Sequence, residues 1–227
     1  AFILYSRNKI LLPGALTGIL LPAMSEVYGG GNKEELAKVH SNSTRYLAML
    51  SFPLCLGGIA IAHQLLPMLY GQSYQPAVLL FDILLVGGAV GFIATSSSSL
   101  LYGTELQRIV VRVGIFAALI NIVISRLTVP GWGAKGVALA TAFAQALAGI
   151  AMMIYAYKIR MKQRFPGTNL LRIFAASLFM GLVVLVIVLS IRGTAGVVLA
   201  LLVSLPLYLF NLFLTRSFTS EDMNLLE

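Results

Sequence analysis

The chain has 227 residues, of which 59% are hydrophobic and 11% are charged, and its mean hydropathy is +0.91. A soluble domain carries about 25% charged residues, so this composition excludes an ordinary soluble protein. The formal net charge of +8 does not indicate a nucleic-acid partner, because the basic residues lie mainly between long apolar stretches. Those stretches are continuous rather than alternating, which disfavours a membrane β-barrel.

Seven apolar stretches follow one another along the chain. Each is long enough to cross a bilayer, which takes about 20 residues of helix, and little sequence remains for a soluble domain. We therefore predict an all-α fold, a polytopic membrane helix bundle with about seven transmembrane helices. The predicted spans are residues 10–28, 46–69, 77–101, 109–129, 135–157, 170–191 and 195–215.

The lysines and arginines are distributed unequally over the two sides of the membrane. When the seven spans are threaded through a bilayer, eleven basic residues fall on one side and five on the other. Positively charged loops stay in the cytoplasm. We therefore predict a multi-pass protein of the cell (inner or plasma) membrane with a cytoplasmic C-terminus.

The part of the chain before the second predicted span gives two expectations. The chain begins at Ala1 rather than at Met, and residues 2–5 have the apolar character of a helix end, so we expect a fragment of a longer protein. Further on, Asn32 followed by Glu35 has the spacing of a helix N-cap and its acidic partner. We predict a short amphipathic cytoplasmic helix over residues 32–45, with His40 solvated.

A basic loop near residue 160 divides the predicted spans into two blocks. Residues 1–160 are predicted to form a transmembrane bundle of about five spans. Residues 161–168 form a cytoplasmic linker. Residues 169–227 form two accessory transmembrane helices and a cytoplasmic tail.

Polar and ionisable side chains within the spans are the candidates for function, because they are costly in hydrocarbon. Asp82 could face a water-filled cavity or pair with a neighbouring arginine. Arg7 and Lys9, at the outer end of the first span, could snorkel to the interface or bind an anionic headgroup. Asn121 could bond between helices or, with Arg126, line a cavity.

Other motifs carry less information. Residues 95–99 are five consecutive hydroxyl residues, which could line a hydrophilic cavity or bond back to their own helix. His40 and His63 have no cluster of Cys, Asp or Glu around them, so we predict neither a metal site nor a cofactor. A G-x-G-x-x-G match at residues 131–136 lacks the preceding strand and following acid of a dinucleotide site.

Three short segments occur in the order found in one transporter family. They are LPAMS at residues 21–25 with KEEL at 33–36, LYG at 69–71 with Tyr74 and PA at 76–77, and Asn121 with PGWGAKGVALAT at 130–141. These segments resemble the LPxLS…EEL, LYGxxYxPA and N…PxyGaxGaAiAT segments of polysaccharide and oligosaccharide flippases. The resemblance covers residues 5–160 approximately.

The resemblance implies a member of the multidrug/oligosaccharidyl-lipid/polysaccharide exporter superfamily, whose proteins have two pseudo-symmetric lobes around a central cavity. The chain would be the C-terminal lobe, and the missing N-terminal lobe would be its partner. The implied function is alternating-access flipping of a polyprenyl-pyrophosphate-linked oligosaccharide for cell-surface polysaccharide such as O-antigen or lipopolysaccharide. The partners would be that lipid-linked oligosaccharide and membrane lipids. The site would comprise Arg7, Lys9, Asp82, Asn121 and Arg126.

Two rival functions remain open at this point. A drug/cation antiporter of the same superfamily would need a cation site lined by acids, and Asp82 is the only acid well inside a predicted span. A membrane glycan polymerase or ligase would need long outer loops with charged groups. The outer loops here are short and nearly uncharged, so we expect a transporter and not an enzyme.

Overall fold

The computed structural model describes residues 18–160, 166–191 and 193–214. Within these ranges every regular element is a helix, and six helices are long and apolar enough to cross a membrane. The all-α, polytopic fold is therefore confirmed. The first predicted span, 10–28, falls partly outside the described residues. Its described part lies in a helical segment, residues 18–29.

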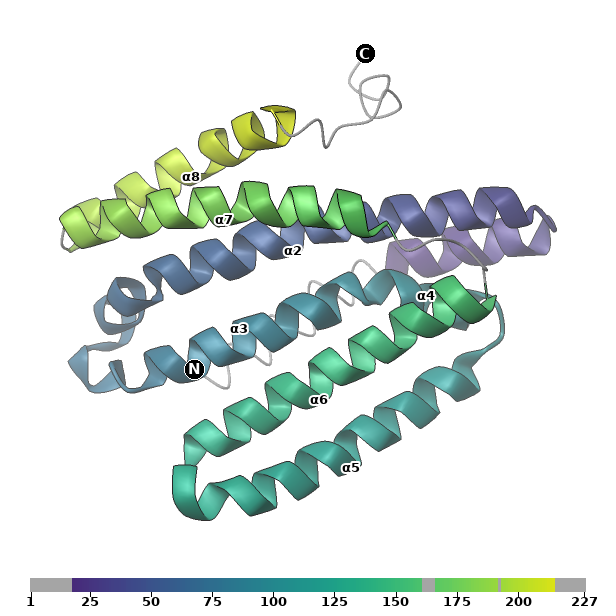
Figure 1. The fold of residues 1–227 in the computed structure, drawn as a ribbon, viewed down its shortest axis with the longest axis horizontal. Coiled ribbons are helices and arrows are strands. Elements are labelled where there is room, and N and C mark those ends of the chain that lie inside the picture. Colours follow the sequence, from purple (N-terminus) through teal and green to yellow (C-terminus); the bar gives the residue numbers. More distant parts are fainter. Residues whose placement is uncertain (1–17, 161–165, 192, 215–227) are drawn as a thin grey trace. The chain divides into compact units, whose positions relative to one another are not determined.

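Most of the helices coincide with the predicted spans, and Figure 1 shows their course in chain order. They are α2 (Lys33–Tyr70), η1 (Gln72–Tyr74), α3 (Ala77–Ile93), α4 (Thr95–Gly103), α5 (Gln107–Trp132), α6 (Ala134–Ile154), η2 (Tyr155–Arg160), α7 (Gly167–Ser190) and α8 (Thr194–Leu214). η1 is a short 3₁₀ turn and η2 is a π-helix.

α2 is longer than the predicted span because it includes the predicted amphipathic segment. The backbone N–H of Glu35 donates to Asn32 Oδ1 at 3.1 Å, and Asn32 Nδ2 donates to Glu35 Oε2 at 3.1 Å, so the predicted cap is present. From there the helix runs without interruption for 38 residues. The expectation that His40 is solvated is wrong, since its side chain is 0% exposed.

Two positions break the helical path where hydropathy alone predicted otherwise. A turn at Ala94 separates α3 from α4, within the single predicted span 77–101. α5 continues through Pro130, and the chain turns only at Gly133, whose φ of 54° is readily adopted by glycine. A proline removes one backbone hydrogen bond, and here that loss does not end the helix.

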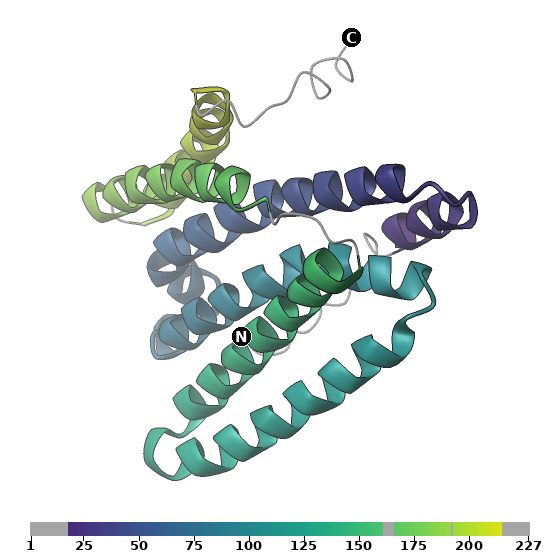
Figure 2. The same cartoon turned by 45° about the vertical axis from the view of Figure 1, so that its right-hand side comes forward.

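The chain forms two compact units, of which the first comprises Ala1–Leu47 and Ile83–Pro166. α5 and α6 lie side by side as a hairpin in both views (Figures 1 and 2). α6 packs closely on α3. The close approach is evident at Gly87, where an added Cβ would overlap the backbone of Ala142. A small apolar core joins residues from four helices: Met24, Leu36, Leu100 and Ala156.

The second unit comprises Ala48–Asp82 and Gly167–Glu227. α7 and α8 form its hairpin. Gln64 of α2 holds the turn of this hairpin, because its Nε2 donates to the Val188 carbonyl and its Oε1 accepts from Gly193 N at 3.2 Å. Tyr208 Oη donates to the Met49 carbonyl at 2.7 Å, so the hairpin is also held some 15 residues nearer the start of α2.

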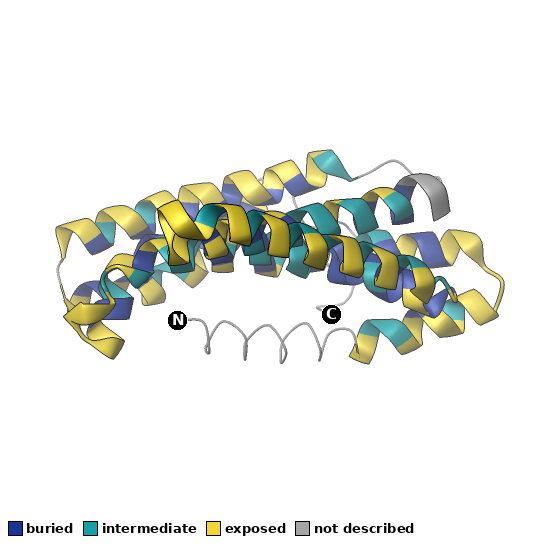
Figure 3. Cartoon of the chain, turned by 90° about the horizontal axis from the view of Figure 1, so that it is seen from below, coloured by how far each residue is buried: buried dark blue, intermediate teal, exposed yellow. Residues whose placement is uncertain are grey.

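Burial varies strongly between helices. Figure 3 shows exposed and buried residues alternating along most of them. In the most apolar window of α5 only 6% of residues are buried, whereas the value is 39% for α7. α5 therefore contributes one narrow face to its unit and leaves the rest of its surface open.

Candidate functional site

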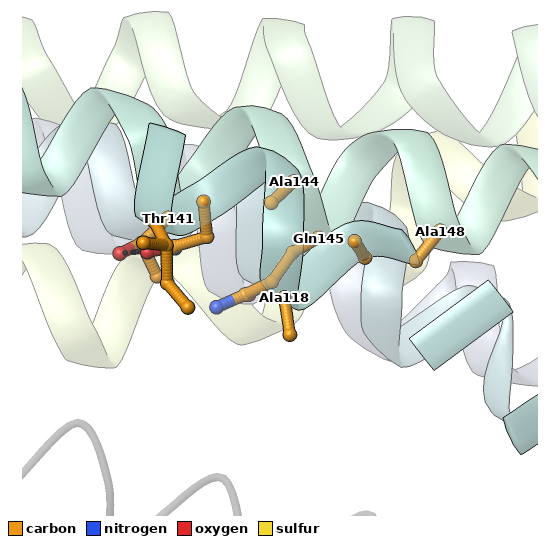
Figure 4. A pocket seen from close by; sticks show the side chains of 8 residues that line it. Ala118, Thr141, Ala144, Gln145 and Ala148 are labelled. Carbon is orange, nitrogen blue, oxygen red and sulfur yellow. Dashed lines mark hydrogen bonds between the residues drawn. The ribbon is translucent and has the colours of Figure 1, made fainter. Parts of the chain in front are cut away.

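A groove of about 370 Å³ lies between α5 and α6, and every residue that lines it belongs to the first unit. Its size falls within the range of small-molecule sites, about 300–1,000 Å³. Figure 4 shows Gln145 extending along the groove, with its amide nitrogen between Thr141 and Ala118. The lining residues are Ala117, Ala118, Asn121, Ile122, Thr141, Ala144, Gln145 and Ala148.

Hydrogen bonds connect the polar side chains of the groove. Asn121 Nδ2 donates to Thr141 Oγ1 at 3.1 Å, which joins α5 to α6. Ser125 Oγ, one turn further along α5, donates to Asn121 Oδ1 at 3.4 Å. The Asn121 amide is therefore held in one orientation by a partner on each side.

The sequence produces this groove by placing small residues on both helices. At the closed end of the hairpin, a Cβ at Gly136 would collide with Thr128, so the two helices approach closely there. Two turns further in, four alanines line the groove. Side chains this short cannot fill the space between the helices, and the amides of Asn121 and Gln145 reach into it.

The chemistry of the groove is neutral hydrogen bonding. None of the eight described residues that line it is charged. Amide and hydroxyl groups donate to and accept from sugar hydroxyls or amides. They do not supply the cationic partner that an anionic headgroup needs. The groove therefore suits an uncharged polar part of a ligand.

Arg126 is predicted as a site residue with Asn121, but the structure places the two on different faces of α5. At about 100° per residue, five positions along a helix correspond to roughly 140° of rotation. Arg126 is exposed, and it does not line the groove. Its side chain is available to a partner on the opposite side of α5.

Asp82 belongs to the second unit, near the start of α3. Ala62 and Leu66 of α2 pack with Val78, which brings His63 and Asp82 to a similar level on neighbouring helices. Asp82 Oδ1 is buried and has no hydrogen-bond partner among the described residues. Of the two alternatives for Asp82, pairing with an arginine is not seen within that part of the chain, and the alternative of a water-filled cavity stays a prediction.

The neighbouring histidine is engaged elsewhere. His63 Nε2 lies 2.8 Å from Gln75 Nε2, so the glutamine amide donates to the ring. The other predicted site residues, Arg7 and Lys9, lie outside the described residues. Within the described ranges there is no group of three His, Cys, Asp or Glu side chains that could hold a metal ion.

Gln145 and Thr141 are the polar groove residues that were not predicted from the sequence, and Gln145 is the larger of the two. It lies in α6, a helix that reads as an apolar, alanine-rich span. Its signal was the spacing from Thr141, since two polar residues four apart share one face of a helix. That spacing predicts a polar stripe, but only the position of α5 shows that Asn121 faces it.

Comparisons with known proteins agree with this helical arrangement. A family profile described as "Lipid II flippase MurJ" matches residues 10–219, which includes the last two helices. The structure titled "Lipid II flippase MurJ, inward closed conformation" superposes with a TM-score of 0.75 and 18% identity. This superposition covers 94% of the chain and 45% of that structure. No curated protein matches the chain in sequence.

These comparisons confirm the broader prediction of a lipid-linked flippase family in the exporter superfamily, and they do not support the polysaccharide-flippase subfamily. The solved structure supports the fold, and the chain spans less than half of its length. The profile covers most of the chain, including the helices for which the sequence motifs were silent. The chain is therefore a multi-pass membrane protein that belongs to the lipid II flippase MurJ family.

Proposed function

We propose that this chain is part of a flippase that moves a lipid-linked cell-wall precursor, lipid II, across the membrane. The observation that carries the proposal is the family match over residues 10–219. The six long apolar helices support it, because they provide a scaffold that crosses the bilayer. The activity is transport without a covalent step in the substrate.

The proposed substrate is lipid II, rather than the oligosaccharide for surface polysaccharide that the sequence motifs implied. The motifs that led to the oligosaccharide occur in residues 21–141, whereas the family profile extends through α7 and α8. Both substrate classes combine a lipid tail with a polar headgroup that does not cross hydrocarbon. A cavity that opens alternately to the two sides would carry the headgroup while the tail stays in the bilayer.

Two of the predicted residues and the polar residues of the groove would divide the headgroup between them. Arg7 and Lys9 would hold the anionic pyrophosphate through charge-assisted hydrogen bonds. Asn121, Thr141 and Gln145 would contact an uncharged sugar or peptide part, which the neutral lining of their groove supports. An inside-negative potential of 100 mV would favour outward movement of two negative charges on the pyrophosphate by about 4–5 kcal/mol.

The arrangement in the membrane is also part of the proposal. Residues 1–160 would form the C-terminal lobe, and an N-terminal lobe of the same protein would complete the cavity. The 45% coverage of the solved flippase supports this division. The C-terminus would be cytoplasmic, as the distribution of eleven and five basic residues indicates. A reporter that works only in the cytoplasm should therefore be active when it is fused to the C-terminus. A reporter that works only outside the membrane should be inactive there.

The function is tested by complementation with the full-length protein. A cell whose own lipid II flippase can be switched off should survive when the full-length protein is expressed. Lipid II accumulated in the inner leaflet should then become accessible from outside, as measured by an externally added enzyme that cleaves it.

Two controls separate the competing substrates. A strain lacking its polysaccharide flippase should not regain surface polysaccharide when the same protein is expressed. Restored polysaccharide without restored lipid II export would return the oligosaccharide as the substrate. Resistance to cationic drugs without either effect would support the antiporter instead.

A further inference from the structure

A buried polar cluster lies at the junction between α3 and α4 in the first unit, away from the α5–α6 groove. The turn at Ala94 is followed at once by hydroxyl residues. Thr95, Ser96, Ser97 and Ser99 are all buried, whereas Ser98 is half-buried. A helix break next to four buried hydroxyls is unusual in a membrane span, because each buried hydroxyl needs a partner.

Hydrogen bonds from α2 satisfy part of this need. His40 Nε2 lies 3.1 Å from Ser97 Oγ, and Ser96 Oγ donates to the His40 carbonyl at 3.1 Å. Thr44 Oγ1 lies 3.2 Å from Ser96 Oγ. One turn of α2 is thus bonded to two successive serines of α4.

A third element closes the cluster from the π-helix η2. The ring of Tyr157 lies with its centroid 4.5 Å from that of His40, tilted by 43°. Both side chains are almost fully buried, at 1% and 0% exposure. π-helical turns occur frequently at functional positions. Three segments far apart in sequence therefore meet at His40.

The cluster is incompletely satisfied. His40 Nδ1 and Ser99 Oγ are buried and have no hydrogen-bond partner among the described residues. Such groups disfavour the closed arrangement, because water would supply the missing bonds. The apolar core joins Leu36, Leu100 and Ala156 of these same three elements to Met24 of the helical segment 18–29, and it favours the closed arrangement. Two opposing effects thus act on one junction.

We propose that His40, Thr44 and Tyr157 form a clasp that holds the α3–α4 junction closed, and that the junction is a hinge which opens to water. The clasp is released when the contacts of His40 with Ser97 and of Thr44 with Ser96 separate. Opening moves α4 relative to α3 and exposes the hydroxyl segment. The clasp itself does not depend on which substrate is carried; its use in the transport cycle rests on the proposed function.

The clasp is tested by the rate at which a cysteine in the hinge reacts with a water-soluble thiol reagent. The reporter is Ser98→Cys, because the hydrogen bonds of Ser98 Oγ within the described residues go to Ala94 O and Thr95 O of its own chain segment. The full-length protein carries this cysteine alone, with Cys55 and any others replaced by serine, in lipid nanodiscs. The reagent is a charged methanethiosulfonate.

Two clasp variants are combined with the reporter. Ser97→Ala removes the hydrogen bond to His40, and His40→Phe removes it while keeping a ring against Tyr157. Each should accelerate labelling roughly fivefold, the change in an opening equilibrium that loss of one ordinary hydrogen bond produces. The control is Thr104→Val, which removes a buried hydroxyl whose hydrogen bond, in the part of the chain that is described, goes to Leu100 O of its own helix. This change should leave the rate unchanged.

A second single-cysteine protein distinguishes local opening from general loosening. It retains the buried Cys55 of the second unit as its only thiol. With Ser97→Ala, labelling of Cys55 should stay slow while labelling at position 98 rises. An unchanged rate at position 98 in both clasp variants, or an equal rise at both cysteines, would overturn the proposal. Either result would leave the complementation test of the transport function intact.

Discussion

The two helical hairpins of this chain differ in whether polar side chains help to attach them to their units. The α5–α6 hairpin is packed on α3 through small residues, with Gly87 against Ala142 and Gly149 against Val90. The α7–α8 hairpin also packs on α2 at a glycine, Gly181 against Leu56. In addition, polar side chains hold it to α2, with Gln64 at its turn and Tyr208 near the other end.

This difference bears on where a ligand can bind. In the second unit, the polar groups at the helix contacts are used for attachment. In the first unit, close backbone packing provides the attachment, and the amides of Asn121 and Gln145 reach into a groove. The α5–α6 hairpin, which contains the groove, is therefore the better candidate for binding. Four substitutions test this comparison.

The largest effect is expected for Gly87→Val. A side chain at this position would overlap the backbone of Ala142, and backbone cannot yield as a flexible side chain can. We expect a loss of at least about 2 kcal/mol of stability, measured as the melting temperature of the purified full-length protein. The matched control is Gly91→Val, one turn along the same helix, where nothing lies within 4 Å. Equal melting temperatures for the two variants would contradict the close packing of α6 on α3.

A smaller loss is expected for Gln64→Leu. The substitution leaves the Val188 carbonyl and the Gly193 N–H without the partner that ties the hairpin turn to α2. We expect a loss of about 1–3 kcal/mol and faster proteolysis at the α7–α8 turn. Gln72→Leu serves as control, because Gln72 is exposed. If Gln64→Leu protects the turn from protease, Gln64 does not anchor it.

Tyr208→Phe should have a more modest effect. It removes one hydroxyl, whose hydrogen bond to the Met49 carbonyl measures 2.7 Å, and it leaves the aromatic packing in place. The expected loss is about 1 kcal/mol, again from the melting temperature. Tyr102→Phe, at an exposed tyrosine of α4, should change stability less. If Tyr102→Phe lowers stability more than Tyr208→Phe does, the Tyr208 hydrogen bond contributes little.

The smallest effect on stability is expected for Gln145→Ala, since the side chain lines an existing groove that the change enlarges. We expect less than about 0.5 kcal/mol, together with a several-fold decrease in lipid II export in the complementation assay. Ser204→Ala is the control, because this half-buried serine of α8 bonds to its own helix at Leu201 O. Normal export by the Gln145 variant would remove the groove from the substrate path.

The sequence was sufficient to locate the helices from α2 onward. Hydropathy integrates over about 20 residues, so single exceptions such as Pro130 do not alter the result. Hydropathy also differs between the two hairpins. The most apolar part of α5 and of α6 has a mean hydropathy of 2.0, compared with 2.8 for α7 and 2.4 for α8. The lower values reflect polar residues such as Asn121 and Gln145 within the spans.

The sequence could not assign those polar residues to a common site. Asn121 and Arg126 were both predicted as site residues, and only the packing of α6 against one face of α5 separates them. His40 was expected in water because it falls in the predicted amphipathic cytoplasmic helix, residues 32–45. It is buried because Ser97 and Tyr157, more than 50 residues away, cover it.

What the sequence by itself determined is thus the membrane environment, the helical fold and the chemical types of polar group in each span. These properties depend on local composition, since a backbone in hydrocarbon must satisfy its own hydrogen bonds. The tertiary structure alone decided which polar groups meet. A helix presents its residues around a full turn every 3.6 positions, and the neighbouring helix determines which of them line a groove, close a clasp or anchor a hairpin.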